Sequence, residues 1–327
     1  MDLDLAIDAV SRETATGAAP RRLQVIVNPV AGRRKRDLVA DSLELLRARG
    51  LEITERDTVG PDHARALARD AVGEPGDLLL VAGGDGTVNE AVNGLVEAAA
   101  ATGRRLPLAI LPLGTANVLA HEIGLQVRPD AIARTVAEGT ARAVTLGRTT
   151  SAGAGSEPAA RCFVLMAGVG FDAHVVEGID LELKKRVGKG AYVWESLRQL
   201  ATFGFPRYRI TIDGRLYDAA SAIIANARCY AGPYVVAPAA GLTRPGLQVL
   251  VFRRGGPLAV ARSAVAMLRN RLSSLPDVSI VEASRIRIEG PEGDPVQGDG
   301  DTLARLSIDI EALPGALDLV MPATPPG

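Results

Sequence analysis

The chain has 327 residues, 47% of them apolar and 23% charged, with a net charge of −1. This length and apolar content are enough for two domains with cores of ordinary size. The near-neutral charge excludes a global basic field, so we expect no nucleic-acid partner. The sequence has no run of about 18 uncharged apolar residues, which is what a membrane-spanning helix requires.

The first 20 residues differ from the rest of the chain. Residues 1–20 show little hydrophobic periodicity, and we expect a flexible N-terminal extension there. The extension begins with the acidic residues Asp2 and Asp4, where a signal peptide would be basic. The two cysteines, Cys162 and Cys229, lack the spacing of a metal site and are expected to be small buried residues in a reducing compartment. We therefore expect a cytoplasmic protein.

Predicted strands and helices alternate in the part of the chain from residue 21 to residue 143. Strands are expected at four segments: Leu23–Val27, Glu52–Arg56, Leu78–Ala82 and Leu108–Leu111. Between them lie a helix with Val39, Leu43 and Leu46 on one face and a helix over His63–Val72. This order predicts a doubly wound parallel α/β domain over 21–143, with its ligand at the carboxyl ends of the strands.

A glycine-rich loop follows the third of these strands. Its residues are Gly83, Gly84, Asp85, Gly86, Thr87, Val88 and Asn89. A helix is expected to follow, because Val88, Ala91, Val92 and Leu95 have helical spacing. Glycines let the backbone approach a ligand closely, and the N–H groups at a helix N-terminus suit phosphate. A carboxylate at Asp85 beside phosphates would order a hydrated Mg²⁺ or a sugar hydroxyl, so the loop predicts a nucleotide site.

The sequence pattern changes near residue 144. The segment 144–314 is predicted to be mostly antiparallel β-structure, with Asp213-Gly214 as the turn of a hairpin between Arg209–Ile212 and Leu216–Ala227. Candidate helices cover roughly 175–186, 191–202 and 257–271. The apolar stretch Leu317–Val320, within a C-terminal segment 315–327, is expected to form a late strand on either domain.

Five segments, in a fixed order along the chain, resemble the diacylglycerol-kinase catalytic family, which comprises bacterial lipid kinases related to sphingosine kinases. They are Asn28–Gly32, Gly83–Leu95, Leu111–Asn117, Ala167–Ala173 and Asp299–Asp301. The resemblance covers roughly residues 21–322. It implies ATP-dependent phosphorylation of a lipid hydroxyl, with Mg²⁺ accompanying the ATP. It also implies an N-terminal nucleotide domain, a C-terminal antiparallel β-sandwich, an active cleft between the two, and a C-terminal segment that returns to the first domain.

The resemblance implies a set of nucleotide-binding residues. They are Asn28, Pro29, Gly32, Thr58, Gly83, Gly84, Asp85, Gly86, Thr87, Val88, Asn89, Gly114, Thr115 and Asn117, with Asp85 also assigned to the catalytic Mg²⁺. Each assignment has a simpler alternative. Thr87 and Thr115 follow glycines and open helices, so either could be an N-cap, and both functions can coexist. Asn28 and Thr58 could be ordinary turn residues.

The Asp299-Gly300-Asp301 segment is the candidate for the catalytic base. An Asp-Gly pair is a common turn, so a hairpin tip is the alternative. Transfer to a lipid alcohol needs a carboxylate that orients the hydroxyl and takes its proton. The family places its base in an Asp-Gly-Glu segment at this point, and Asp301 is one methylene shorter than that Glu. We expect Asp299 to be the base with Asp301 as its partner or as the Mg²⁺ organiser, and the reverse assignment stays open.

Two departures from the family pattern concern metal. Relatives often hold a structural Mg²⁺ with carboxylates around 243–249, where this chain has Arg244, Pro245 and Gln248 instead. These residues cannot supply anionic oxygens, so we expect the regulatory metal site to be absent or altered. Val118 also stands where many relatives have Asp, which weakens any metal function at that position.

A lipid kinase without a spanning helix must reach the membrane surface, and two segments are candidates. The first has cations at Lys184, Lys185, Arg186 and Lys189, followed by interfacial aromatics from Tyr192 to Tyr208. The second is the amphipathic stretch Val260–Leu272. Each could instead be an ordinary helix of the fold. We expect a peripheral protein at the inner membrane face whose partner is a lipid substrate, and homodimerisation is left open.

Two other functions compete with that of a lipid kinase. The Gly83–Thr87 loop alone also suits an NAD kinase-like enzyme, but this leaves Asn28–Gly32 and the Asp299–Asp301 segment without a function. A catalytically silent nucleotide-binding regulator would fit the altered metal segment. The sequence does not identify the lipid, because acceptor pockets of this kind are apolar and select by shape.

Overall fold

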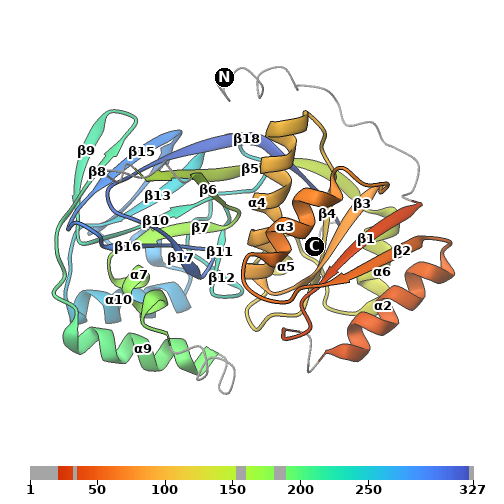
Figure 1. The fold of residues 1–327 in the computed structure, drawn as a ribbon. Helices are drawn as coiled ribbons and strands as arrows, with labels where there is room; N and C mark the ends of the chain where they lie inside the picture. Colours follow the sequence, from red (N-terminus) through yellow and green to blue (C-terminus); the bar gives the residue numbers. More distant parts are fainter. Residues whose placement is uncertain (1–20, 32–34, 152–159, 180–188, 324–327) are drawn as a thin grey trace. The chain divides into compact units, whose positions relative to one another are not determined.

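The computed structural model describes residues 21–31, 35–151, 160–179 and 189–323 (Figure 1). The expected extension at 1–20 and Gly32 of the nucleotide site therefore lie outside the described residues, as do Lys184, Lys185 and Arg186. The chain divides into two compact units. Unit 1 comprises residues 1–144 together with 315–327, and unit 2 comprises residues 145–314.

The helices and strands alternate in unit 1 and are mainly strands in unit 2. The elements of unit 1 are β1 Arg22–Val27, α2 Arg36–Ala48, β2 Glu52–Asp57, α3 His63–Ala71, β3 Leu78–Gly83, α4 Asp85–Thr102, β4 Leu108–Pro112, α5 Val118–Glu122 and α6 Pro129–Glu138. The elements that follow are β5 Thr140–Ser151, β6 Ala160–Phe163, β7 Met166–Val169, α7 Phe171–Glu177, α9 Lys189–Thr202, β8 Tyr208–Ile212, β9 Arg215–Ala219, β10 Ser221–Ala225, β11 Cys229–Tyr230, β12 Tyr234–Val235, β13 Leu247–Phe252, α10 Pro257–Leu268, the 3₁₀ turn Leu272–Ser274, β14 Val278–Ala283, β15 Arg285–Glu289, β16 Pro295–Gly298, β17 Asp301–Arg305 and β18 Ile308–Met321.

Unit 1 is built on a parallel sheet with the strand order β2-β1-β3-β4, completed by the end of β18. Leu319 of β18 pairs with Leu108 of β4 in parallel. Every residue of β3 is buried, as expected for a central strand with helices on both faces. Because the chain runs from β1 to β2 on one side and then to β3 on the other, the strand order reverses between β1 and β3, which is where such sheets bind ligands.

The helices of unit 1 pack in two pairs, α3 with α4 and α2 with α6 (Figure 1). The pairing of α3 with α4 is close because Gly94 lies at the contact. A Cβ atom at Gly94 would lie 2.1 Å from the carbonyl oxygen of Arg65. The absence of a side chain therefore brings two helix backbones together. The contact holds α4 against α3, and α4 begins at the predicted phosphate loop.

Unit 2 is an antiparallel sandwich. One sheet has the order β14-β13-β10-β7-β16-β17, and the other contains β9, β8 and β15 with the first part of β18. Buried side chains from both sheets form one core, which includes Phe163, Tyr208, Val249 and Ile286. The fold is therefore the predicted one, an N-terminal α/β domain followed by a C-terminal antiparallel β-sandwich.

The predicted hairpin at Asp213-Gly214 is confirmed, but its second strand is shorter than expected. Asp213 and Gly214 have φ values of 43° and 84°, as a tight hairpin turn requires, and they join β8 to β9. The segment Leu216–Ala227 is not one strand. It passes from β9 in one sheet to β10 in the other at Ala220. The burial changes at the same point, since β9 is largely exposed whereas β10 is almost entirely buried.

The helix predicted over 175–186 overlaps α7 at its start, and its residues 180–186 lie outside the described residues. The structure has α7 over Phe171–Glu177, and the chain leaves the helix at Gly178. A Cβ atom at Gly178 would lie 2.1 Å from a carboxylate oxygen of Glu195 on α9, so this position is fixed by packing between helices. The other two predicted helices match α9 and α10 within three residues at each end. Among the described residues, no helix is long and apolar enough to cross a membrane.

Candidate active site

Two loops of unit 1 meet backbone to backbone at the carboxyl edge of the sheet. The first leads from β3 to α4, and the second from β4 to α5. A Cβ atom at Gly84 would lie 3.3 Å from the Cα atom of Gly114, and one at Gly114 would lie 2.9 Å from the Cα atom of Gly84. Both positions therefore need glycine for close approach. The pairing of Gly83 with Pro112 in the register of β3 and β4 brings the loops together.

Asn28 and Thr87 connect the end of β1 to the start of α4. The Asn28 side-chain amide donates to Thr87 Oγ1 at 2.9 Å, and Asn28 Oδ1 accepts from the backbone N–H groups of Val30 and Ala31 at 3.0 and 3.2 Å. Asn28 is thus also the turn residue that the sequence suggested as an alternative. Helix α4 begins at Asp85 with Gly84 as its N-cap, so Thr87 is inside the first turn and is not the cap.

Asp85 holds the two glycine loops in register. Its carboxylate accepts hydrogen bonds from the backbone N–H groups of Val118 at 3.1 Å and Leu119 at 3.2 Å, which are the first residues of α5. Burial raises the pKa of Asp85, and these two hydrogen bonds act against that shift. The Asp85 carboxylate therefore has a structural function, because it holds the start of α5 against the start of α4. Each oxygen keeps a lone pair for water or a hydrated cation.

Asn117 has two unusual features for a residue in a loop. Its backbone is left-handed with a φ of 47°, and its buried Oδ1 atom has no hydrogen-bond partner among the described residues. The same atom would lie 2.9 Å from a Cβ atom at Gly114. A buried polar atom without a partner is costly in free energy, by about 1–3 kcal/mol. Asn117 is therefore a candidate for direct contact with a ligand, and Thr115 beside it is exposed.

The remaining predicted nucleotide residues lie around these loops with varied exposure. Thr58 follows β2, where its backbone N–H donates to the carbonyl of Val27 at 2.8 Å. Pro29 is exposed in the loop after β1. Val88 and Asn89 are buried in the first turns of α4, and the Asn93 side chain donates to the backbone oxygen of Asn89 at 2.9 Å. Asn89 thus contributes to the helix interior.

Lys35 is a site residue that the sequence did not single out. Its Nζ atom donates to the carbonyl oxygens of Pro112 at 3.3 Å and Gly114 at 3.2 Å, although these residues are nearly 80 positions away. Burial lowers the pKa of this ammonium group. Lys35 therefore places a cation against the second glycine loop. The only sequence signal was the basic run Arg33–Arg36 after the Asn28 turn.

The residues of unit 1 fit a nucleotide's phosphates. The close approach of Gly84 and Gly114 brings two loops together beside the N-terminus of α4, which supplies N–H groups, and Lys35 supplies a cation. Asp85 and Asn117 contribute oxygen atoms of the kind that Mg²⁺ and its water ligands prefer. Among the described residues, no group of three or more His, Cys, Asp and Glu side chains is placed to hold a metal by itself. Any Mg²⁺ here would depend on phosphate oxygens.

In unit 2, Asp299 is tightly held by backbone donors. Its carboxylate accepts from the N–H groups of Val164 at 2.7 Å, Leu165 at 2.9 Å and Met166 at 3.0 Å. Its own N–H donates to the carbonyl of Met166 at 3.0 Å, and its φ of 52° is left-handed. Asp299 is therefore an anchor between the loop after β16 and the segment before β7. The hairpin-tip alternative accounts for much of its geometry.

Asp301, two residues later, has different surroundings. It is the first residue of β17, where it pairs with Gly298, and its side chain is exposed. Its carboxylate has no hydrogen-bond or ion-pair partner among the residues that the structure describes. The exposed carboxylate of Asp301 is consequently the one that could accept a proton from an incoming hydroxyl without giving up an existing contact.

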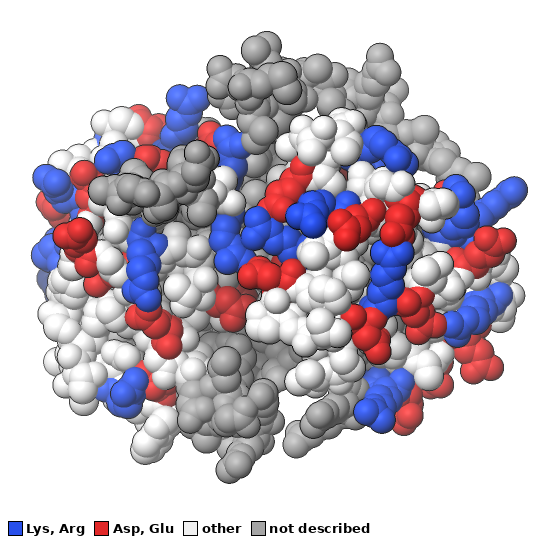
Figure 2. Space-filling view, in the orientation of Figure 1, with Lys and Arg blue, Asp and Glu red and all other residues white. Residues whose placement is uncertain are grey.

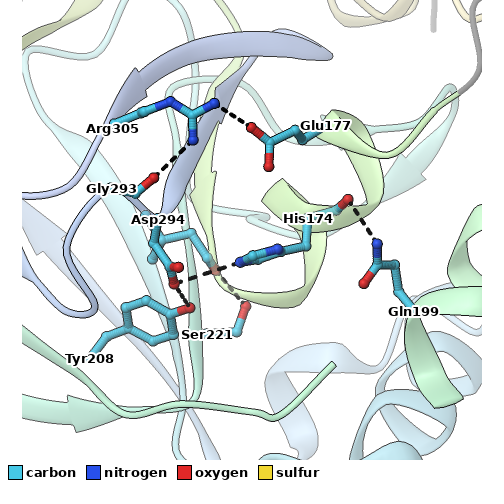
Figure 3. A network of polar contacts seen from close by, with 9 residues as sticks. His174, Glu177, Gln199, Tyr208, Ser221, Gly293, Asp294 and Arg305 are labelled. Carbon is cyan, nitrogen blue, oxygen red and sulfur yellow. Dashed lines mark hydrogen bonds and ion pairs between the residues drawn. The ribbon is translucent and has the colours of Figure 1, made fainter. Parts of the chain in front are cut away.

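A network of polar groups, most of them half-buried or exposed, lies near this turn in unit 2. His174 on α7 points its Nε2 atom towards Asp294 Oδ2 at 3.6 Å, and the Tyr208 hydroxyl donates to the same oxygen at 2.7 Å (Figure 3). Burial, together with Asp294, raises the pKa of Tyr208. Arg305 links Glu177 at 2.6 Å to the carbonyl of Gly293 at 2.8 Å. These contacts tie α7 to the β15–β16 connection and to β17.

Asp172, at the start of α7, contacts side chains from two other segments. It accepts hydrogen bonds from the Gln297 side-chain amide at 2.7 Å and from the Tyr230 hydroxyl. A Cβ atom at Gly168 would lie 2.6 Å from Asp172 Oδ2, so a glycine is needed there. Burial raises the pKa of Asp172, while its two hydrogen bonds act against the shift. Asp172 therefore supports Gln297, which in turn accepts from the N–H of Gly300 at 3.2 Å.

The segment expected to lack a metal contains a turn and the start of a strand. Gln248 is buried in β13, opposite Glu282 of β14. The carbonyl oxygen of Arg244 accepts a hydrogen bond from the Thr145 hydroxyl. Gly246 approaches β14 so closely that a Cβ atom would lie 3.3 Å from a carboxylate oxygen of Glu282. Backbone packing and hydrogen bonds thus hold this segment in place, and its own residues contribute no carboxylate.

Comparison with known proteins places this geometry in a family. Residues 22–149 match the family model described as the diacylglycerol kinase catalytic domain, and residues 166–321 match the YegS C-terminal NAD kinase beta sandwich-like domain. A Pseudomonas aeruginosa protein named "Probable lipid kinase YegS-like" is 30% identical over 86% of this chain and 88% of that protein. The chain belongs to the diacylglycerol kinase family. The resemblance seen in the sequence is thereby confirmed.

Other members of the diacylglycerol kinase family match over nearly the full length. A Mycobacterium tuberculosis protein named "Diacylglycerol kinase" is 29% identical over 92% of this chain and 95% of its own length. A crystal structure of a Bacillus anthracis diacylglycerol kinase superimposes with a TM-score of 0.73 at 24% identity, covering 93% of this chain and 98% of that one. This structural likeness supports the two-domain fold.

Proposed function

We propose that this member of the diacylglycerol kinase family is an ATP-dependent lipid kinase. It would transfer the γ-phosphate of ATP to the hydroxyl of a membrane lipid, either diacylglycerol or a sphingoid or ceramide-like lipid. The observation that carries the proposal is the close approach of Gly84 and Gly114, which joins the loop before α4 to the loop before α5 at the carboxyl edge of the sheet. A backbone cradle of this kind at a helix N-terminus suits the phosphates of a nucleotide.

The donor half of the reaction belongs to unit 1. The N–H groups at the start of α4 would hold the phosphates, with Thr87 oriented by its hydrogen bond from Asn28. Lys35 would keep the second glycine loop in place through the carbonyls of Pro112 and Gly114. Asp85 and Asn117 are the residues that would hold Mg²⁺ through its water ligands, and this ion would neutralise developing charge on the phosphates.

The acceptor half belongs to unit 2 and centres on the Asp299–Asp301 segment. Catalysis of this transfer requires a carboxylate that orients the lipid hydroxyl and takes its proton. Three backbone donors already occupy Asp299, whereas Asp301 is exposed. These contacts favour Asp301 as the base and Asp299 as the residue that fixes the turn, which is the reverse of the preferred sequence-based assignment.

The test is a transfer assay with labelled ATP and a panel of acceptors dispersed in detergent. The panel contains diacylglycerol, monoacylglycerol, sphingosine, ceramide and NAD. We expect label to appear in at least one lipid and not in NAD, and the reaction to require Mg²⁺. Label in NAD alone would support an NAD kinase-like enzyme and contradict the proposal.

A silent nucleotide-binding regulator is the remaining alternative, and the absence of carboxylates at Arg244 and Gln248 favours it. It would bind ATP but label none of the acceptors. Isothermal titration of ATP on the same preparation separates this outcome from a protein that has lost its nucleotide site. The expected location, in the cytoplasm and at the inner membrane face, follows only if the acceptor is a membrane lipid.

A further inference from the structure

Exposed large apolar side chains are concentrated on two helices of unit 2. Among the described residues, five such side chains lie on α9 and α10: Trp194, Leu197, Leu258, Val265 and Leu268. The others are isolated in loops of unit 1 or on the hairpin strand β9. Single exposed apolar residues are normal on a protein surface, whereas a group of five on neighbouring helices indicates an interaction surface.

Helix α10 is apolar in composition but lies on the surface. Its sequence from Pro257 to Leu268 contains one charged residue, Arg262, yet Ala266 is its only buried residue. Leu258, Ala261, Val265 and Leu268 have the spacing of one helical face, and all four are exposed. The side chain of Leu258 is 88% exposed. A helix of this composition would normally be buried, so the exposed face needs a partner.

Helix α9 presents a matching stripe. Trp194, Leu197 and Ala201 are spaced by three and four residues and are all exposed. Glu195 of α9 is buried, and the side-chain amide of Gln199 links α9 to α7 by donating to the carbonyl of His174 at 3.4 Å. The two helices contact each other, and they lie side by side in Figure 1. We name the two exposed stripes together the α9–α10 face.

The charged residues of α10 and of its flanking segments are all arginines. Residues 253–276 contain five arginines and neither Asp nor Glu, in a chain whose net charge is −1. Arg262 pairs with Asp277, but Arg253, Arg254, Arg269 and Arg271 are exposed and have no ion-pair partner among the described residues. They stand in pairs at the two ends of the apolar stripe. On the face of the molecule that Figure 2 shows, by contrast, charged side chains of both signs are interspersed.

We propose that the α9–α10 face docks the protein on an anionic lipid bilayer, an inference that rests on the proposed lipid-kinase function for its biological sense. Helix α10 would lie in the plane of the interface, with Leu258, Val265 and Leu268 among the acyl chains. The flanking arginines would reach lipid phosphates from both ends of the helix. A second copy of the chain is a poorer occupant, because a symmetric contact would bring arginines against arginines.

The chain has a built-in reporter for this docking, because Trp194 is its only tryptophan and is 64% exposed. The full-length protein is mixed with vesicles of phosphatidylcholine containing a quarter phosphatidylglycerol, or with phosphatidylcholine vesicles alone. We expect the tryptophan emission to shift to the blue and the protein to sediment with the anionic vesicles. Binding to the neutral vesicles should be at least tenfold weaker, and raised salt should weaken the anionic binding.

The decisive variant is the double substitution Leu258→Glu with Leu268→Glu, and Leu216→Glu is its matched control. Leu216 is 62% exposed on β9 of the same unit, on the last strand in the order of its sheet and more than 40 positions before α10. The double variant should lower the partition coefficient for anionic vesicles at least tenfold, and the control should leave it unchanged. Equal binding by wild type and double variant would overturn the proposal, as would a blue shift that depends on protein concentration without vesicles.

Activity in detergent-dispersed lipid separates this proposal from the proposed function. The double variant should phosphorylate dispersed lipid at the wild-type rate, because the substituted side chains lie on the outer face of α10. If no lipid is phosphorylated but the wild type binds anionic vesicles through α10, the lipid-kinase function fails and the docking face stands. If lipid is phosphorylated but vesicle binding does not depend on α10, the docking face fails alone.

Discussion

Asp299 and Asp301 show how two carboxylates two residues apart can have different surroundings. Asp299 accepts three backbone hydrogen bonds in a left-handed turn, whereas Asp301 is exposed at the start of β17. To take a proton from a substrate hydroxyl, the Asp299 carboxylate would have to give up contacts that it already makes. The same contacts make it valuable for stability, because each backbone donor would otherwise lie unpaired in the protein.

Substitution of each carboxylate by asparagine should separate these functions. Asp301→Asn is expected to lower kcat for lipid phosphorylation by about 10²–10⁴-fold with an unchanged melting temperature, because it removes the base and no contact. Asp299→Asn is expected to lower the free energy of unfolding by about 1–3 kcal/mol, because its amide group cannot accept all three hydrogen bonds. A fully active Asp301→Asn enzyme beside a stable, inactive Asp299→Asn enzyme would restore Asp299 as the base.

Asp172 gives a pH-dependent prediction. Burial raises its pKa above 3.8, so the folded state favours the protonated carboxyl group. Such a group stabilises the fold most below pH 4, and this stabilisation is lost as the pH rises through the pKa of the folded state. Asp172→Asn removes this dependence. The stability of the variant relative to wild type should therefore rise between pH 4 and pH 8, as measured by urea unfolding, and a difference that falls over this range would contradict the argument.

At the scale of elements, glycines decide how α3 and α4 pack. A Cβ atom at Gly94 would lie 2.1 Å from the carbonyl oxygen of Arg65, which belongs to a helix backbone and cannot move independently. Gly94→Ala is therefore expected to destabilise unit 1 by about 1–3 kcal/mol through overpacking, despite alanine's better helix propensity. The measurement is chemical unfolding followed by circular dichroism.

Gly60→Ala is the matched control for that substitution. Gly60 lies in the loop before α3, with no atom within 4 Å of its Cβ position and no left-handed φ. We expect a change within about 0.5 kcal/mol at this surface position. If Gly94→Ala unfolded at the same denaturant concentration as Gly60→Ala, the close approach of α3 and α4 would be wrong.

Elements of unit 1 could be predicted from sequence because their signals are local. The buried run Leu78–Ala82, the glycines that follow and the helical spacing after Val88 all lie within 20 residues, and β3 and α4 appear there. Boundaries were less predictable. The start of α4 at Asp85 depends on the approach of Gly84 to Gly114, a contact across 30 residues that no local pattern reveals.

Contacts between distant segments were the part of the candidate site that the sequence could not reveal. Lys35 binds the carbonyls of the second glycine loop across nearly 80 positions, and its only signal was a basic run that reads equally well as exposed surface. The anchoring of Asp299 by the segment 164–166 spans more than 130 positions. An Asp-Gly-Asp segment looks the same whichever carboxylate is anchored, so only the fold could distinguish them.

At the scale of the whole molecule, the chain passes through unit 1 twice. Residues 1–144 form most of this unit, and residues 315–327 belong to it although all of unit 2 intervenes. Within unit 1, Leu317 and Leu319 of β18 are buried, and Asp318 pairs with Arg105 at 3.1 Å. The last strand therefore completes the core of unit 1.

This arrangement predicts that the C-terminal strand controls the stability of the nucleotide site. Leu319 is fully buried and pairs with Leu108 of β4, so Leu319→Ala should cost about 2–5 kcal/mol through lost burial and a cavity. Unit 1 should then unfold before unit 2, giving two transitions in place of one. If ATP binds folded unit 1, as we propose, saturating ATP should return the first transition towards its wild-type position. Leu216→Ala, at a position 62% exposed on β9, is the control and should change neither transition by more than about 0.5 kcal/mol. A single, unshifted transition for Leu319→Ala would show that unit 1 does not need the end of the chain.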